Sequence, residues 1–187
     1  MQDAFALADR VRERGGPPVV FFTYANPVDA FGAERFAREA AGAGALGAIV
    51  PDLPLEESGD VRAALNSRGL ALPLLIAPTT PAARARRIAE ASQGFVYVVS
   101  RLGVTGARKR PDLSAVAQRV AELRTYTTLP LAVGFGISTA EDVRDVAAFA
   151  DGIIVGSALV DVYAGRTGPD AAAAALRFLS QLGAGQP

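Results

Sequence analysis

Two glycine-containing turns offer the clearest chemistry in this sequence of 187 residues. Gly134-Phe135-Gly136 follows the apolar run Leu129–Val133, and Gly156-Ser157 follows the apolar run Gly152–Val155. Each run is typical of a buried strand, and a helical segment follows each turn. Backbone N–H groups at such a turn, with a helix N-terminus behind them, bind anions without a basic side chain. We therefore expect a phosphate-bearing small molecule here; the alternative is that the glycines only make tight turns.

Composition excludes much of the remaining catalytic chemistry. The sequence contains no cysteine and no histidine, so Ser-His-Asp and Cys-His nucleophilic sites and the commonest zinc ligand are ruled out. Acid–base catalysis within the chain has to come from Asp, Glu, Tyr or Lys. Lys109 is the only lysine and hence the only candidate for a Schiff base.

The charge balance argues against two classes of partner. Lys plus Arg and Asp plus Glu number 19 each, which leaves no basic footprint for nucleic acid or an anionic membrane. No apolar run approaches the length of a membrane span. The first residues do not form a signal peptide, because Asp3 and Asp9 interrupt their apolar positions. We expect a cytoplasmic protein with no nucleic-acid or membrane partner.

Apolar, β-rich runs alternate with helical patterns along the whole chain. The six expected strands are Val19–Tyr24, Gly47–Val50, Leu72–Ala77, Phe95–Ser100, Leu129–Val133 and Gly152–Val155. Their spacing of roughly 25–30 residues is that of βα units, which predicts a parallel sheet with helical cover. The first run is almost entirely apolar, so we expect it to be covered on both faces. After the break at Asn26-Pro27, Asp29 is expected to cap a helix that reaches about Ala43.

The α/β pattern allows two closures, an open doubly wound sheet and most of an eight-stranded barrel. A complete (β/α)₈ barrel takes about 250 residues, and this sequence opens on a helical pattern rather than a strand. The glycine turn of a dinucleotide-binding fold is missing, because Tyr24-Ala25-Asn26-Pro27 follows the first strand. We predict one domain over residues 1–187, an incomplete (β/α)₈ TIM barrel of six parallel strands.

Five segments carry a resemblance to a known family. They are VVFFTYANPV, GAIVPDLPLEES, FVYVVSRLGVTGAR, AVGFGIS and DGIIVGSALV. Their order and spacing resemble the tryptophan synthase alpha subunit over essentially the whole chain. The resemblance implies a lyase of tryptophan biosynthesis that cleaves indole-3-glycerol phosphate reversibly to indole and glyceraldehyde 3-phosphate. It also implies a heterotetramer with a beta subunit; pyridoxal phosphate belongs to that subunit, and no cofactor is expected in this chain.

The same resemblance implies roles for individual residues around the substrate. Backbone amides and one hydroxyl would bind the phosphate, two residues would flank the phosphate or line the indole pocket, and one residue of the loop after the fourth strand would close over the substrate. The implied phosphate ligands are Gly136, Gly156 and Ser157, joined by Gly106 on loop closure; Phe135 flanks the phosphate, Tyr97 lines the indole pocket, and Thr105 is the lid residue.

A second implied surface follows the first strand. Tyr24, Asn26 and Pro27 would lie near the beta-subunit interface by resemblance. The alternative for these residues is a strand end followed by a proline turn.

The resemblance to a sister phosphate-binding barrel such as phosphoribosylanthranilate isomerase is weaker, because SRLGVTGA argues against it.

The sequence departs from the family at its two catalytic carboxylates. In the family a glutamate protonates C3 of the indole and an aspartate assists at the ring nitrogen, and both motifs are expected before Met1, in the first two strand–helix units. Asp52 lies at the end of a strand, but we expect it to hold a turn or to support the site from behind the reacting groups rather than to transfer protons. We expect the 187-residue chain to lack useful lyase activity. The alternative function is a non-catalytic protein that binds phosphate or the beta subunit.

Overall fold

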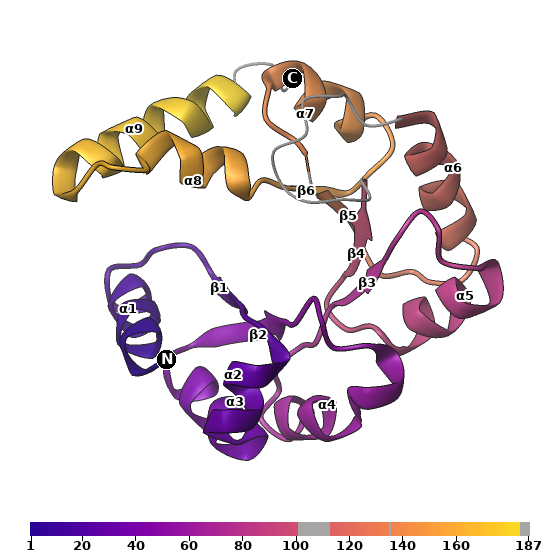
Figure 1. Ribbon diagram of the computed structural model, residues 1–187, viewed down its shortest axis with the longest axis horizontal. Helices are drawn as coiled ribbons and strands as arrows, with labels where there is room; N and C mark the ends of the chain where they lie inside the picture. The colour runs from indigo at the N-terminus through magenta and orange to yellow at the C-terminus, as the bar shows by residue number, and fades with distance from the viewer. Residues whose placement is uncertain (101–112, 135, 184–187) are drawn as a thin grey trace. The chain divides into compact units, whose positions relative to one another are not determined.

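The computed structural model describes residues 1–100, 113–134 and 136–183 (Figure 1). Thr105, Gly106 and Phe135 lie outside the described residues. Contacts between residues divide the chain into two compact units, Met1–Leu74 with Ala91–Gly94, and Leu75–Glu90 with Phe95–Pro187. The interpretation of residues 1–187 as a single domain stays a prediction.

The first unit contains two parallel strands and the helices that precede and follow them. Its elements are α1 (Gln2–Glu13), β1 (Val19–Phe22), α2 (Ala25–Phe31), α3 (Ala33–Gly42), β2 (Ala45–Ile49), the 3₁₀ turn η1 (Leu55–Glu57) and α4 (Gly59–Asn66). β1 and β2 pair in parallel, with Val20 opposite Gly47 and Phe22 opposite Ile49. A further bridge joins Gly47 to Ala71.

An aromatic cluster forms the core of the first unit. The Phe5 ring of α1 meets the Phe21 ring of β1 edge-on, with 5.2 Å between centroids. The Phe36 ring of α3 lies 5.8 Å from the Phe5 ring and is 1% exposed. Edge-to-face and tilted aromatic pairs at these separations add stabilisation beyond the buried area. Sequence-distant helices are thus fixed on one face of β1.

The structure corrects the expectation that β1 is covered on both faces. Phe21 packs in the aromatic cluster, whereas Val20 and Phe22 are 36% and 52% exposed. Alternate residues of a strand point to opposite faces. In the described residues of this unit, only the Phe21 face of the strand is therefore packed against helices.

The expected single helix after β1 is also wrong. Gly32 has a φ of +87° and ends α2, and α3 begins at the next residue. Asp29 lies inside α2 and caps nothing; glycine adopts a positive φ without a Cβ penalty, so the break falls there. β1 ends before Asn26-Pro27, and Pro27 lies in the first turn of α2, where its missing N–H removes no helical bond.

The second unit is built on a sheet with the order β3-β4-β5-β6. β4 with β5 and β5 with β6 pair in parallel. The elements are β3 (Leu74–Ile76), α5 (Ala82–Ala91), β4 (Val96–Val99), α6 (Leu113–Leu123), β5 (Leu131–Gly134), α7 (Ala140–Ala147), β6 (Gly152–Ile154), α8 (Ser157–Tyr163) and α9 (Gly168–Gly183). The predicted alternation of strands and helices is confirmed, and each of the six strands begins and ends within about two residues of its expected bounds.

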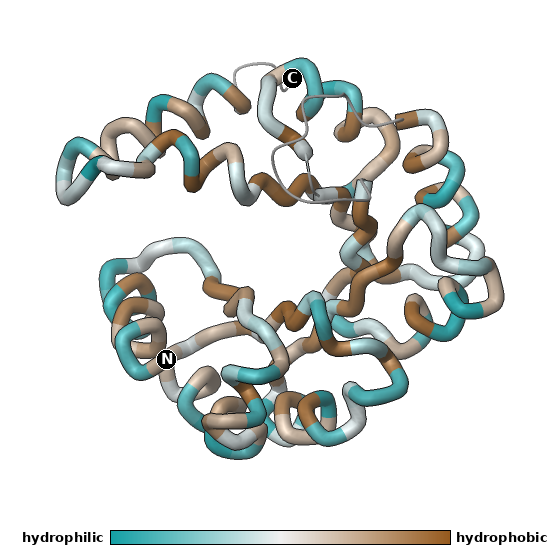
Figure 2. The backbone as a smooth tube through the Cα atoms, viewed as in Figure 1, coloured by the Kyte–Doolittle hydropathy of each residue, from teal (hydrophilic) through white to brown (hydrophobic). Residues whose placement is uncertain are grey.

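Apolar strand residues and one helix face form the core of this unit. Val96 and Leu131 have no exposed surface, and α6 contributes Val116, Val120 and Leu123 at helical spacing. Figure 2 shows β3, β4 and β5 in the hydrophobic colour, while α5 and α6 alternate between hydrophilic and hydrophobic segments. Over residues 1–100, 113–134 and 136–183, no helix has both the length and the apolar composition needed to cross a membrane.

A glycine at the β2–Ala71 bridge is required by close backbone approach. A Cβ at Gly47 would overlap the Ala71 carbonyl oxygen and lie 3.0 Å from the carbonyl carbon. We predict that Gly47→Ala lowers the free energy of unfolding by about 1–3 kcal/mol, because backbone atoms have to move apart. Gly42→Ala is the matched control: nothing lies within 4 Å of its Cβ position in α3, so stability should stay level or rise slightly. Urea unfolding curves measure both, and equal effects would contradict the steric argument.

Candidate functional site

The two glycine turns follow neighbouring strands, at the carboxyl end of the four-stranded sheet. Gly134 at the end of β5 lies opposite Val99 of β4 and opposite Ile154 of β6. The carboxyl ends of parallel strands meet at the same sheet edge, where open and closed α/β sheets bind ligands. Gly136 and Gly156 each follow two residues after the paired positions Gly134 and Ile154. The pairing therefore delivers both turns to one place.

The backbone of the first turn needs a glycine. Gly136 has a φ of +82° and is exposed. A side chain at a positive φ is strained, so the turn conformation itself selects glycine at this position. The second turn is different: Gly156 is the N-cap of α8 and Ser157 is its first residue, and both are exposed.

A buried carboxylate closes the N-terminus of α7. Asp142 is 6% exposed, and its Oδ2 accepts the N–H of Ser138 at 3.0 Å and the N–H of Thr139 at 2.9 Å. In return, the Thr139 hydroxyl accepts the Asp142 N–H at 3.1 Å, which completes a capping box. The donors and the positive dipole end of α7 are therefore already matched by this protein's own negative charge.

The N-terminus of α8 has the opposite character. No acidic residue lies in its first turn and no side chain caps it. The partial positive charge of a helix N-terminus favours anions within about one turn. Of the two helices that follow the glycine turns, α8 is therefore the one that favours an anion. If a helix N-terminus contributes to the expected phosphate site, it is therefore that of α8, at Gly156 and Ser157, and not that of α7.

Tyr97 lies on the strand next to the first turn. It is 3% exposed on β4, and a Cβ at Gly134 would overlap its hydroxyl and lie 2.7 Å from its Cε2. The ring therefore lies directly against the Gly134 backbone. Burial raises the pKa of Tyr97 well above its ordinary value, because the ionised form loses solvation.

Ser100 follows β4 and bonds to the same glycine. Its N–H and its hydroxyl both donate to the Gly134 carbonyl, at 2.9 Å and 2.7 Å, and the residue is 4% exposed. We did not single out Ser100 or Asp142 from the sequence. Thr139-x-x-Asp142 matches a capping-box pattern and could have been found locally. The Ser100 bond depends on the β4–β5 register, for which no local pattern exists.

The residues of the expected partner surface lie in the first unit. Tyr24 is the N-cap of α2 and 60% exposed, and Asn26 and Pro27 are exposed in the first turn of that helix. Asp52 Oδ1 accepts the N–H of Ala25 at 2.9 Å. This bond holds the start of α2 against the loop after β2; the prediction that Asp52 does not transfer protons stays a prediction.

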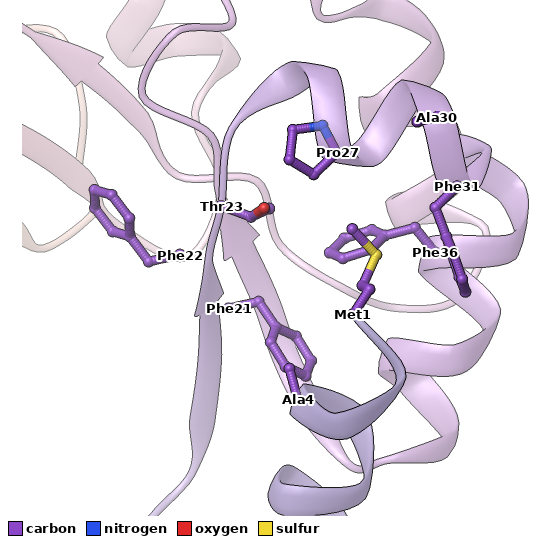
Figure 3. A pocket seen from close by; sticks show the side chains of 9 residues that line it. All are labelled: Met1, Ala4, Phe21, Phe22, Thr23, Pro27, Ala30, Phe31 and Phe36. Atoms are coloured by element: carbon purple, nitrogen blue, oxygen red, sulfur yellow. The ribbon is translucent and has the colours of Figure 1, made fainter.

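An apolar pocket of about 390 Å³ lies beside these residues (Figure 3). Of its lining side chains only Thr23 carries a hydroxyl, and Phe22 points away from the ring cluster of Phe21 and Phe36. The lining comes from α1, β1, α2 and α3: Met1, Ala4, Phe21, Phe22, Thr23, Pro27, Ala30, Phe31 and Phe36. The pocket lies wholly within the first unit, and none of the side chains that line it is charged.

Comparison with known proteins decides the family. The model of the tryptophan synthase alpha chain family matches residues 1–182. The chain belongs to the tryptophan synthase alpha chain family. The alpha chain of Opitutus terrae is 48% identical over 159 residues, which cover 85% of this chain and 59% of that relative. The alpha chain of Picosynechococcus sp. is 44% identical and covers 97% of this chain and 69% of its own length.

Solved structures of tryptophan synthase have the same fold. A Mycobacterium tuberculosis tryptophan synthase structure in space group F222 matches with a TM-score of 0.88 and 35% identity, over 99% of this chain and 68% of the other. The alpha subunit from Campylobacter jejuni matches with a TM-score of 0.83 and 29% identity, over 97% and 71%. These matches confirm the predicted α/β fold of tryptophan synthase alpha barrels. The chain spans about three fifths of the length of the Opitutus relative, 59%.

The structure divides the predicted site residues of this alpha chain family member into three groups. Tyr97, Gly136, Gly156 and Ser157 come together at the edge where β4, β5 and β6 end. Tyr24, Asn26 and Pro27 lie in the other unit. Thr105, Gly106 and Phe135 are outside the described residues, so their predicted roles stay predictions.

Burial of Tyr97 predicts a loss of stability at high pH. Burial raises its pKa in the folded chain above the ordinary tyrosine value of about 10, so the folded state keeps the proton when the unfolded state releases it. The contribution is complete below pH 10 and falls above it, by at most about 1.4 kcal/mol per pH unit. Urea unfolding between pH 8 and 11 measures the slope. Tyr97→Phe should flatten it and Tyr163→Phe, at an exposed position, should not; equal slopes in all three proteins would contradict the assignment.

Proposed function

We propose that this chain acts as a tryptophan synthase alpha chain, a carbon–carbon lyase of tryptophan biosynthesis. The proposed reaction is the reversible retro-aldol cleavage of indole-3-glycerol phosphate to indole and glyceraldehyde 3-phosphate. One observation carries the proposal: in a chain of this family, the ends of β5 and β6 present Gly136 and the uncapped N-terminus of α8 at one sheet edge. This arrangement fits the phosphate of such a substrate.

Each end of the substrate has proposed contacts. The Gly136 and Gly156 amides and the Ser157 hydroxyl bind the phosphate, and Gly106 and Phe135 complete that end. Tyr97 lines the indole pocket, which its burial beside Gly134 supports. Thr105 is the proposed lid residue that excludes water over the bound substrate.

Proton transfer is not assigned to any of the 187 residues. Cleavage needs a proton at C3 of the indole and assistance at the ring nitrogen. Asp52 is the carboxylate nearest to these roles by its place after a strand, but it holds the N–H of Ala25. The proposal therefore gives these residues the binding of the substrate, and a second candidate function is a non-catalytic protein that binds phosphate or the beta subunit.

The proposed partner is the tryptophan synthase beta subunit in an alpha2-beta2 heterotetramer. Tyr24, Asn26 and Pro27 are proposed to lie near its interface, and their exposure around the start of α2 supports this. Pyridoxal phosphate belongs to that partner, and no cofactor is proposed for this chain. The proposed location is the cytoplasm.

Substrate binding and indole release test the function separately. We expect the 187-residue chain to bind indole-3-glycerol phosphate, measured by calorimetry, with or without a beta subunit. We expect indole release to be slower than that of a full-length alpha subunit by at least about 10²–10⁴-fold, the contribution of a general acid or base. A release rate near the full-length rate would show that residues within the chain supply the protons. Absence of substrate binding would contradict the proposed function itself.

A charge placed at the α8 N-terminus tests the phosphate contacts. We predict that Ser157→Asp weakens binding of indole-3-glycerol phosphate at least tenfold, because the carboxylate repels the phosphate and satisfies the helix end itself. Ser180→Asp is the matched control, since Ser180 is exposed on α9 of the same unit; its affinity should remain within about twofold. If both variants lose affinity equally, the effect is one of net charge and the assignment of Ser157 is wrong.

A further inference from the structure

The Gly134 carbonyl receives two hydrogen bonds from one residue. The Ser100 N–H donates at 2.9 Å, and this bond continues the ladder between β4 and β5. The Ser100 hydroxyl donates to the same oxygen at 2.7 Å. Strand pairing requires only the first bond. The second one is an addition at the last position before the chain leaves the sheet for the glycine turn.

The other end of this turn is also held. The Asp142 carboxylate binds the N–H groups of Ser138 and Thr139, as described for the α7 capping box. Between these anchors lies Gly136, exposed and with a φ of +82°. Described hydrogen bonds therefore hold the backbone at Gly134, before the glycine whose amide is proposed to meet the phosphate, and at Ser138 and Thr139, after it.

Glycine makes such anchoring necessary. Because it has no Cβ, glycine has the widest choice of backbone conformations, and ordering it costs more entropy than ordering any other residue. A backbone amide that has to be ordered on binding loses affinity, whereas a preorganised amide does not. A hydroxyl that fixes the carbonyl two residues earlier reduces this cost before any ligand arrives.

We infer that Ser100 is a positioning residue for phosphate binding: its hydroxyl holds the Gly134 carbonyl so that the Gly136 amide is directed at a phosphate oxygen. Ser100 does not touch the ligand and acts through the backbone. The inference rests on the proposed function, since it concerns the same phosphate site. It adds a residue that lies before the turn and on a different strand.

The test uses the full 187-residue chain and inorganic phosphate as the probe. Phosphate is titrated at constant ionic strength against chloride, and the NMR shift of the Gly136 amide reports binding at the turn. The variant is Ser100→Ala, which keeps the N–H bond and removes the hydroxyl bond. Ser58→Ala is the matched control, because Ser58 is fully buried and its hydroxyl donates to the Leu55 carbonyl at 2.8 Å. Both variants lose one buried hydroxyl-to-carbonyl bond, so their melting temperatures should fall by similar amounts.

We expect both variants to lose similar stability, and only the Ser100 variant to lose affinity for phosphate. Ser100→Ala should weaken phosphate binding about three- to tenfold, the effect of one hydrogen bond, while Ser58→Ala leaves it unchanged. Should Ser100→Ala not fold, Ser100→Cys keeps the side-chain shape with a somewhat larger atom and a weak donor, and it should also lose affinity. Binding by either Ser100 variant at the wild-type affinity overturns the inference and leaves the proposed function intact. If phosphate does not shift the Gly136 amide of the wild-type chain, the proposed phosphate site and this inference both fail.

Discussion

The proposed phosphate site depends on the parallel pairing of β5 with β6. Placing Ala132 opposite Gly152 and Gly134 opposite Ile154 makes both strands end at one level of the sheet. Because side chains alternate with a period of two, a slip of one residue would turn every side chain to the other face and move one turn away from the other. Buried residues on β5 hold this register: Leu131 and Val133 have no exposed surface.

The N-termini of the two helices that follow these strands differ in the charge around them. Asp142 stabilises the α7 N-terminus with a buried negative charge, and its carboxylate already accepts the Ser138 and Thr139 amides. An anion placed there would meet like charge at close range in a partly desolvated setting, which is unfavourable. At α8 the first turn lacks an acidic residue and no described side chain caps the helix. The N-terminus of α7 is thus stabilised by the protein's own carboxylate, and the N-terminus of α8 is the one suited to an anionic ligand.

Local sequence patterns predicted the elements but not the contacts that finish the site. Apolar runs with regular spacing located six strands, because burial in a parallel sheet demands such runs. The exposure of Val20 and Phe22 could not be read from VVFF, since an apolar strand looks the same whether or not a second layer covers it. Gly32 was missed as a helix break because its effect depends on a positive φ. The Ser100 hydroxyl bond follows from register, a relation between two strands rather than a property of either one.

A phosphate site made of backbone amides and a serine hydroxyl has consequences for its response to pH. The chain contains no histidine, so no side chain of ordinary pKa changes charge between pH 5 and 8. The proposed donors Gly136, Gly156 and Ser157 do not titrate in this range either. Any change in affinity near neutrality would then arise from the ligand, whose phosphate ester takes on its second negative charge near pH 6. Since the dipole of α8 favours the dianion more than the monoanion, affinity should rise through that ionisation and level off above it. A basic side chain at the site would add its own charge to this balance, whereas the proposed donors among the described residues are backbone dipoles and a hydroxyl, whose positions are set by the fold.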